Sequence, residues 1–456
     1  MTTLPSGWCR AHGLAIALIS LWAASCGEPV SAPTVEAVAA RGSAGSSGPV
    51  VSSFTPAEAP RQITIDLTVK GSGFDNGSIV RLEKNNAPVP NVTTNSTSFV
   101  NSKQLVASIT ISAEAVPDLY DVAVITTGGK RGIGAEQFQV MEVVFLGPLE
   151  DEWLMWGAAI NAHGHVVGFG ATRPFFWSPA GGPEWLDGVW GAEGGMNDLD
   201  QVVGVTCGWS LAVNPTCGTS DQYGVLWRRQ GSGWTPTTLT GRGGTAWDIN
   251  NSGQIYGNDP GPTRWTITAT GLTRDALPVP PSRPAAIVRR ANHTGQAAGG
   301  DVVWSFDGAA VSFVILAAPA GGSQPGISDL SDRNGAGEMV VAGTATFSGY
   351  PQPVRWRLRQ SGGAWQVLAA ERLAAPVKSV QGWARGVNNL GEVVGSVTSR
   401  GGVELAVRWP LSGTPVVLPQ SRNRSYNCAA HAINDMGWVT GRIEGLYNGA
   451  VLWRAP

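Results

Sequence analysis

The strongest constraint on this chain is a short phrase that recurs seven times between residues 160 and 441. The phrase is an apolar residue, Asn, two variable residues, Gly, one variable residue, an apolar pair and a second Gly, as in Ile160–Gly168. A tryptophan follows each copy at a matching place. The copies recur about every 45 residues, and such a period indicates supersecondary units that stack to bury a common core. The recurring asparagines are Asn161, Asn197, Asn250, Asn292, Asn334, Asn388 and Asn434.

Each copy predicts four short strands. In the first copy, residues 157–160 and 165–169 are two apolar runs joined by the segment Asn161–Gly164. Asn at the first position of a tight turn bonds its own backbone, and Gly at the fourth tolerates positive φ. Residues 174–177 and 184–186 supply a third and a fourth strand. Four strands in about 45 residues is the size of a propeller blade, so we expect an all-β, seven-bladed β-propeller over residues 142–456.

The two ends of the array predict that the ring closes. The last copy stops after its third strand, residues 450–453, and a spare strand at residues 143–149 precedes the first copy. Pairing the spare strand with the last one would remove an exposed sheet edge.

Together with the apolar-Trp strand that follows it, the phrase resembles the HAF-type extracellular repeats of bacteria over residues 143–456. The resemblance implies an extracellular repeat module and supplies no catalytic residues. The copies are imperfect: Asp200 replaces the turn glycine of the second, and the fifth has two extra residues between Gly337 and Gly343.

The N-terminal third predicts export. Residues 1–25 have Arg10, a short apolar run at 14–19 and then small residues, which is typical of a signal peptide. The segment ending at Cys26 resembles a bacterial lipobox, which implies that Cys26 is lipidated and anchors the chain in a membrane. We expect the outer membrane or the cell surface; ordinary cleavage and secretion is the alternative. Residues 26–48 are rich in Ala, Gly, Ser and Pro and predict a flexible tether.

Residues 49–141 predict a separate β domain with alternating, half-buried strands. The segment Ser53–Pro56, the signature Val69–Phe74 and the turn at residues 128–129 resemble an IPT/TIG immunoglobulin-like domain. The resemblance implies a sandwich that acts as a spacer or an interaction module.

Composition limits the partners and the compartment. The formal charge is −2 and no basic run occurs, which argues against nucleic acid as a partner. Cys207 and Cys217 flank an insertion in the second copy, so in an oxidising compartment we expect a disulfide between them. Cys428 is then expected to be a small buried residue.

Tryptophans divide into two groups. Those that follow the repeated phrase are expected to fill the space between blades: Trp177, Trp227, Trp265, Trp304, Trp356, Trp409 and Trp453. The repeat pattern does not require the remaining tryptophans. Several of them precede the first strand of a unit, so we expect them towards one face of the ring. The candidates for ligand binding are Trp153, Trp156, Trp190, Trp247 and Trp383, with Trp209 as a further non-repeated tryptophan.

Chemistry-bearing motifs are weak. His163 and His165 could share a metal ion, but no Cys or carboxylate recurs with them, so we expect no metal and no cofactor. No phosphate loop, zinc-protease motif or nucleophile elbow occurs. The sequence therefore predicts a monomeric surface lipoprotein that binds a glycan or a protein and has no catalytic activity. The alternatives are a propeller-based carbohydrate-active enzyme, a lyase or a hydrolase, and a structural envelope protein.

Overall fold

Short apolar runs separated by Gly, Asn and Pro give this chain an all-β fold. A computed structural model describes residues 48–147, 155–188, 194–207, 221–307, 310–361, 363–419, 426–444 and 448–454. In these ranges, no helix combines the length and the apolar character needed to cross a bilayer.

The strands before residue 146 form a curved, half-barrel sheet around their own core. β3 pairs with β1 and β7, β7 pairs with β6, and β8 pairs with β4 and β9. Side chains alternate between buried and partly exposed along β7, so one face packs inward on a core that includes Leu105, Ile109 and Phe138. The strands are β1(Val50–Thr55), β2(Glu58–Arg61), β3(Ile63–Ser72), β4(Ile79–Lys84), β5(Ala87–Pro88), β6(Val92–Asn101), β7(Gln104–Ile111), β8(Asp118–Ile125) and β9(Arg131–Phe145).

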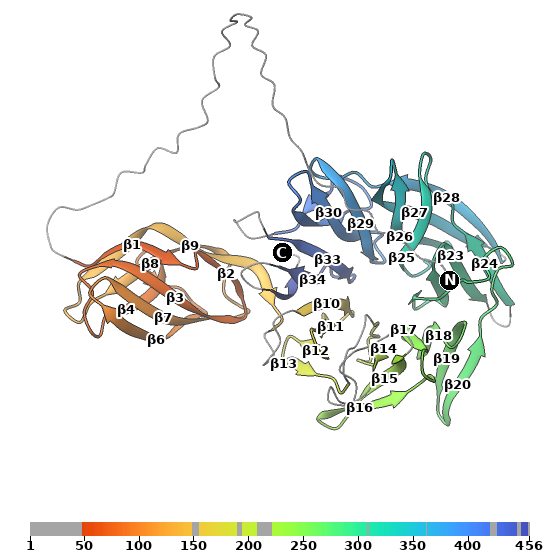
Figure 1. Ribbon diagram of the computed structural model, residues 1–456, viewed down its shortest axis with the longest axis horizontal. Coiled ribbons are helices and arrows are strands. Elements are labelled where there is room, and N and C mark those ends of the chain that lie inside the picture. The colour runs from red at the N-terminus through yellow and green to blue at the C-terminus, as the bar shows by residue number, and fades with distance from the viewer. Residues whose placement is uncertain are drawn as a thin grey trace, which may run out of the picture. The chain divides into compact units, whose positions relative to one another are not determined.

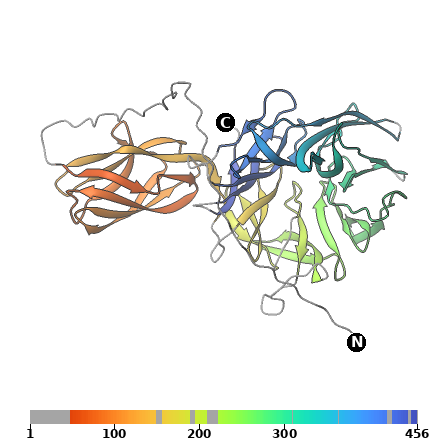
Figure 2. The ribbon, with the colours of Figure 1, turned by 45° about the horizontal axis from the view of Figure 1, so that its top comes forward.

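The repeated part of the chain has a propeller arrangement, with small antiparallel sheets radiating from a common centre (Figures 1 and 2). Over the described residues six of these sheets stand alone. The first three are β10(Met155–Ile160), β11(Val166–Gly170), β12(Pro174–Ser178), β13(Gly182–Trp185); β14(Val202–Thr206), β15(Tyr223–Gln230), β16(Gly233–Thr238); and β17(Thr245–Ile249), β18(Gln254–Asn258), β19(Pro262–Thr268), β20(Gly271–Ala276). The next three are β21(Arg290–Ala291), β22(Gln296–Gly299), β23(Val302–Asp307), β24(Ala310–Ile315); β25(Ser323–Leu330), β26(Glu338–Phe347), β27(Tyr350–Ser361), β28(Ala364–Arg372); and β29(Ser379–Val387), β30(Val393–Ser399), β31(Glu404–Trp409), β32(Val416–Val417).

The last repeat is completed by a strand from far earlier in the chain. β33(Cys428–Ile433), β34(Val439–Ile443) and β35(Gly449–Trp453) pair in order, and β35 then pairs antiparallel with β9, with Trp453 opposite Val143. This is the strand pairing that the sequence predicts. The spare strand is, however, the end of one 15-residue strand, so the expected domain boundary at residue 142 falls inside β9.

The seven tryptophans that follow the repeated phrase are all buried, with at most 3% of their surface exposed. They lie between neighbouring sheets; Trp227, for example, packs in one cluster with Val167 and Phe176 of the preceding sheet. Its indole N–H also donates to the carbonyl oxygen of Asp187 at 2.6 Å, in the segment that connects the two sheets. The prediction that these tryptophans form the core is confirmed.

The two glycines of the phrase have separate physical causes. The first ends the Asn turn with positive φ, as at Gly164 with φ 77°, and Asp200 adopts φ 56° where it replaces that glycine. The second faces a bulge in the inner strand: a Cβ on Gly395 would lie 1.9 Å from the carbonyl oxygen of Trp383. Glycine adopts the turn's positive φ at no steric cost, and at the second position the absence of a Cβ permits the close approach of the two strands.

Two cysteine predictions fall on described residues. Cys207 is buried and disulfide-bonded, while its expected partner Cys217 lies outside the described residues. Cys428 is a buried free thiol, and burial raises its pKa to about 12. Cys26 and the whole of residues 1–47 also lie outside the described ranges.

Candidate functional site

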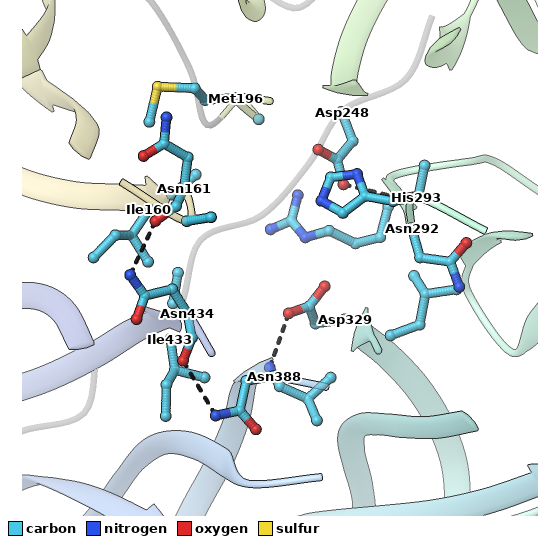
Figure 3. A pocket seen from close by; sticks show the side chains of 18 of the residues that line it. Ile160, Asn161, Met196, Asp248, Asn292, His293, Asp329, Asn388, Ile433 and Asn434 are labelled. Carbon is cyan, nitrogen blue, oxygen red and sulfur yellow. Dashed lines mark hydrogen bonds between the residues drawn. The ribbon is translucent and has the colours of Figure 1, made fainter. Parts of the chain in front are cut away.

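Five of the seven repeated asparagines link the inner ends of the sheets to one another, while Asn250 donates to Gln254 of its own turn. Asn434 donates from Nδ2 to the carbonyl oxygen of Asn161 at 2.9 Å, and Asn388 donates to that of Asn434 at 3.1 Å (Figure 3). Asn161 and Asn197 make the same bond to the next turn. Each asparagine oxygen also accepts N–H groups of its own turn. The asparagines are therefore structural, as their turn positions predict.

The fifth copy of the phrase departs from this pattern. Asn292 donates to the carbonyl oxygen of Ser331 at 2.8 Å and not to Asn334. The side-chain oxygen of Asn334 accepts hydrogen bonds only from N–H groups of its own turn. The Asn turn of this copy therefore lies three positions beyond Ser331, the residue that continues the ring of turns.

A second set of bonds runs through the residue after each ring position. The backbone N–H of each residue donates to the side chain of its counterpart in the next turn: Ala162 to Asp198, Asp198 to Asn251, Asn251 to His293, His293 to Asp332, Asp332 to Asn389 and Asn389 to Asp435. These six bonds, 2.7 to 3.1 Å long, join seven successive turns. The first turn cannot accept such a bond from the last turn, because the side chain of Ala162 has no hydrogen-bond acceptor.

Bulges turn other side chains towards the centre of the propeller. The register shifts by one residue in five inner strands, at Ala158, Trp247, Ser328, Arg385 and His431. A bulge inserts one unpaired residue and re-aims its side chain. All five bulge residues line the same cavity.

Two adjoining cavities occupy the centre. The larger, about 380 Å³, is lined by the turns and by the last residues of the inner strands; we call it the central cavity (Figure 3). The smaller, about 170 Å³, shares Ala158, Gly194, Arg290, Arg385 and His431 with the central cavity; we call it the Trp–Arg cavity. Its lining is Trp156, Ala158, Gly194, Trp247, Arg289, Arg290, Ile327, Ser328, Arg385 and His431.

Charged side chains of the central cavity tie neighbouring sheets together. Asp248 accepts the N–H of Ala291 and Asp329 accepts that of Val387, both at 2.9 Å (Figure 3). Arg290 lies near both carboxylates and donates from Nε to the carbonyl oxygen of Ser328 at 2.9 Å. Burial raises the pKa of Asp248, and raises that of Asp329 to about 7 although Arg290 opposes the shift.

His431 occupies a comparable place between the last inner strand and the first. Its Nδ1 lies 2.8 Å from the carbonyl oxygen of Gly157. A carbonyl oxygen can only accept, so Nδ1 carries the hydrogen and Nε2 is left as an acceptor. Burial and the nearby Arg385 lower the pKa of His431 to about 3, which keeps the ring neutral at neutral pH.

The Trp–Arg cavity combines aromatic rings with guanidinium groups. Arg289 lies over the ring of Trp247, 5.1 Å from its centre, and Arg385 lies 5.8 Å from the ring centre of Trp383. These three tryptophans, Trp156, Trp247 and Trp383, are all partly exposed. Arg289 is exposed, and Arg290 and Arg385 are half-buried.

The predicted ligand-binding tryptophans thus come together in part. Trp156 and Trp247 line one cavity, and Trp383 reaches it through Arg385. Trp153, Trp190 and Trp209 lie outside the described residues. His165 bonds Asp200 at 2.8 Å with Nδ1, and in the described ranges no group of three or more His, Cys, Asp or Glu side chains is placed to hold a metal ion.

Sequence reasoning missed the polar residues of the inner strands. Asp248, Arg290 and Asp329 each stand two residues before a ring position, and Arg385 and His431 stand three before. An alignment of the copies on the asparagine shows varied residues two and three positions before it. Those two positions would have identified four of the five residues. Asp329 is the exception, because the fifth copy aligns on Ser331 instead of Asn334.

Comparison with known proteins adds little. No protein-family model matches the chain, and no curated protein matches it either. Among solved structures it is similar, at 9% identity and a TM-score of 0.19, to the extracellular domain of a hybrid two component system from B. thetaiotaomicron. That alignment covers 88% of this chain and 64% of the other, so the chain spans less than two thirds of its length. A likeness this distant carries no argument, and the residues of the chain itself must supply the function.

Proposed function

We propose that this protein is an exported, lipid-anchored binding protein whose propeller receives a glycan or protein ligand at the Trp–Arg cavity. Cys26 carries the anchor, residues 26–48 form the tether, and residues 49–141 form an immunoglobulin-like spacer of the IPT/TIG kind. The propeller belongs with the HAF-type repeats and closes as a ring of seven blades. The bonds that join seven successive turns and the pairing of β35 with β9 support this blade number.

One observation carries the binding role. Trp156 and Trp247 come from different sheets, neither belongs to the repeated pattern, and both open on one cavity. The repeated tryptophans are buried without exception, so a tryptophan that only supports the fold would be expected to be buried as well. Partly exposed aromatic side chains that converge on a recess are the anchors that recognition surfaces use.

The test is binding of the purified full-length chain to glycan and protein arrays. Trp156→Ala and Trp247→Ala should each lower the signal of any ligand found by tenfold or more, on the scale of an interface anchor. Trp185→Ala is the matched control, because this partly buried tryptophan of β13 lines neither cavity. A ligand whose binding is unchanged in both cavity variants would place the site elsewhere.

The anchor has its own test. A doubly or triply acylated cysteine holds a protein firmly at a membrane, whereas one acyl chain holds it only marginally. Cys26→Ser should therefore release the protein from the membrane fraction or block its maturation. A variant that matures and fractionates as the parent does would refute lipidation at Cys26.

A carbohydrate-active enzyme is the second candidate, and one observation favours it. Asp248 and Asp329 share the central cavity and both have a raised pKa, which is a frequent property of catalytic acids. Their bonds to Ala291 and Val387 give them a structural role as well. Release of new reducing ends from a glycan bound by the array, lost in Asp329→Asn but not in Trp185→Ala, would establish the enzyme.

A further inference from the structure

The lining of the Trp–Arg cavity carries positive charge and, over the described residues, no carboxylate. Arg289, Arg290 and Arg385 contribute guanidinium groups to it. Asp248 and Asp329 line only the central cavity, which shares Arg290 and Arg385 with the Trp–Arg cavity. Arg385 reaches Glu404 at 3.4 Å, and Glu404 lines neither cavity. Among the described residues, the charged side chains that line the Trp–Arg cavity itself are therefore cationic.

Two of the three guanidinium groups lie over aromatic rings. Arg289 lies 5.1 Å from the ring centre of Trp247, and Arg385 lies 5.8 Å from that of Trp383. A guanidinium carries five N–H donors in the plane of the group, so a face that lies over an indole does not use those donors. Arg385 gives one of its donors to Glu404. Such a stack also reduces the side-chain freedom that binding would otherwise remove. The non-repeated tryptophans thus position arginines in addition to offering their own surface.

The remaining polar groups of the cavity fit hydroxyls. His431 presents Nε2 as an acceptor because its Nδ1 donates to Gly157. Ser328 offers a hydroxyl that can donate or accept, and Trp156 offers part of a flat apolar surface. An acidic peptide side chain would bring acceptors for the arginines but no donor for His431. A sugar that carries an acidic group brings both, together with a ring that can lie on an indole.

We propose that the Trp–Arg cavity binds the anionic group of an acidic saccharide, held by Arg289 and Arg385, with the sugar ring beside Trp156. This inference rests on the proposed binding function and narrows its ligand to a chemical class. Carboxylate and sulfate groups share the chemistry that the two arginines recognise, because both offer paired oxygens to a planar guanidinium.

The experiment measures binding of the full-length chain to four probes by calorimetry at low salt. The probes are oligogalacturonate, its methyl ester, heparin oligosaccharide and poly-glutamate. Oligogalacturonate or heparin should bind, the uncharged ester should bind at least about tenfold more weakly, and the affinity should fall as salt is added. The first and third probes distinguish a carboxylate from a sulfate as the anionic group.

Variants assign the binding to this cavity. Arg289→Gln and Arg385→Gln should each lower the affinity for the acidic saccharide by about tenfold or more, on the scale of a charge-assisted hydrogen bond. Arg228→Gln is the matched control, since this exposed arginine of β15 lines neither cavity. Thermal melting of each variant separates a loss of binding from a loss of folding.

Three results would overturn the inference: the methyl ester binds as tightly as the acid, poly-glutamate binds more tightly than either saccharide, or both arginine variants bind as the parent does. Binding of a neutral glycan that is lost in Trp156→Ala but kept in Arg289→Gln would refute the acidic saccharide as the ligand. It would leave the proposed binding function intact. Unchanged binding of every ligand found in all cavity variants would refute both.

Discussion

The turns and the bulges of the inner strands follow different rules. At the turns, the same residue types recur and bond to their counterparts in the next turn, as Asn388 does to Asn434. At the bulges, three residues before each ring position, stand Ala158, Trp247, Ser328, Arg385 and His431, which share no chemistry. A repeat protein needs identical residues where its units join. Positions that vary inside a strict repeat are free to serve a ligand, and this contrast locates the Trp–Arg cavity.

Buried and exposed tryptophans give the largest expected difference. Trp177 is fully buried between sheets, so Trp177→Ala should lower the free energy of unfolding by about 3–5 kcal/mol. Trp247→Ala removes a partly exposed ring and should cost far less, about 1 kcal/mol or below. Denaturant unfolding of both variants measures the difference. Similar losses in the two would contradict the division of tryptophans into core and cavity groups.

The turn ring gives a smaller, directional effect. Asn197 is completely buried and its side chain bonds Asn250, Gln201 and Leu199, so Asn197→Ala leaves several buried polar groups without partners. We expect a loss of about 2–4 kcal/mol.

Asn334 supplies the matched control for that loss. Its side-chain oxygen bonds only the N–H groups of Ala336 and Glu338 in its own turn, so Asn334→Ala should cost about 1 kcal/mol. Chemical denaturation of the two variants side by side checks the order. An equal or larger loss at Asn334 would show that the fifth turn also supports the ring.

Much of this fold could be predicted from the sequence, because its repeats are dictated by short-range chemistry. The Asn turns, the turn glycines and the buried Trp177 and Trp453 follow from turn geometry and apolar patterning within one unit. The strand pairing of Val143 with Trp453 could also be predicted, since an unmatched strand at one end needs a partner at the other.

The candidate site was harder to predict from the sequence, because it depends on contacts between repeat units. A bulge at Arg385 or His431 is a matter of strand register, which no periodic pattern of apolar residues reveals. The role of Ser331 as a ring position was hidden by the nearby Asn334, which fits the phrase better. The shared cavity of Trp156 and Trp247 follows from the order of sheets around the centre, not from the spacing of the two residues.

Two titratable residues of the inner strands, His431 and Asp329, predict opposite pH dependences of stability. The pKa of His431 is lowered from 6.5 to about 3 on folding, and Arg385, Arg442 and the Gly157 carbonyl face it. The unfolded chain therefore takes up a proton first as pH falls, and the folded protein loses stability between about pH 6.5 and pH 3. His431→Gln should remove part of this loss, so its melting temperature should fall less steeply from pH 7 to pH 4. A parallel decline in parent and variant would show that His431 is not responsible.

Asp329 should act in the other direction. Its pKa is raised from 3.8 to about 7, so the unfolded chain ionises first as pH rises and stability falls between about pH 4 and pH 7. Asp329→Asn keeps an acceptor for the Val387 N–H and cannot ionise. The variant should melt a few degrees above the parent at pH 8, and the difference should vanish near pH 4. No difference at pH 8 would mean that Arg290 fully compensates the carboxylate charge.

The smallest expected effect is the coupling between Trp247 and Arg289. Their stack leaves the guanidinium exposed, where a cation–π contact contributes about 0.5–1 kcal/mol. A double-mutant cycle with Trp247→Ala, Arg289→Gln and the double variant should give a coupling of that size in the free energy of unfolding. The cycle repeated on the binding free energy of an acidic saccharide should give a larger coupling, because removing the ring frees the arginine that the ligand needs. Equal couplings in unfolding and binding would mean that Trp247 holds Arg289 for the fold alone, and the contrast between the turns and the bulges of the inner strands would lose its functional meaning.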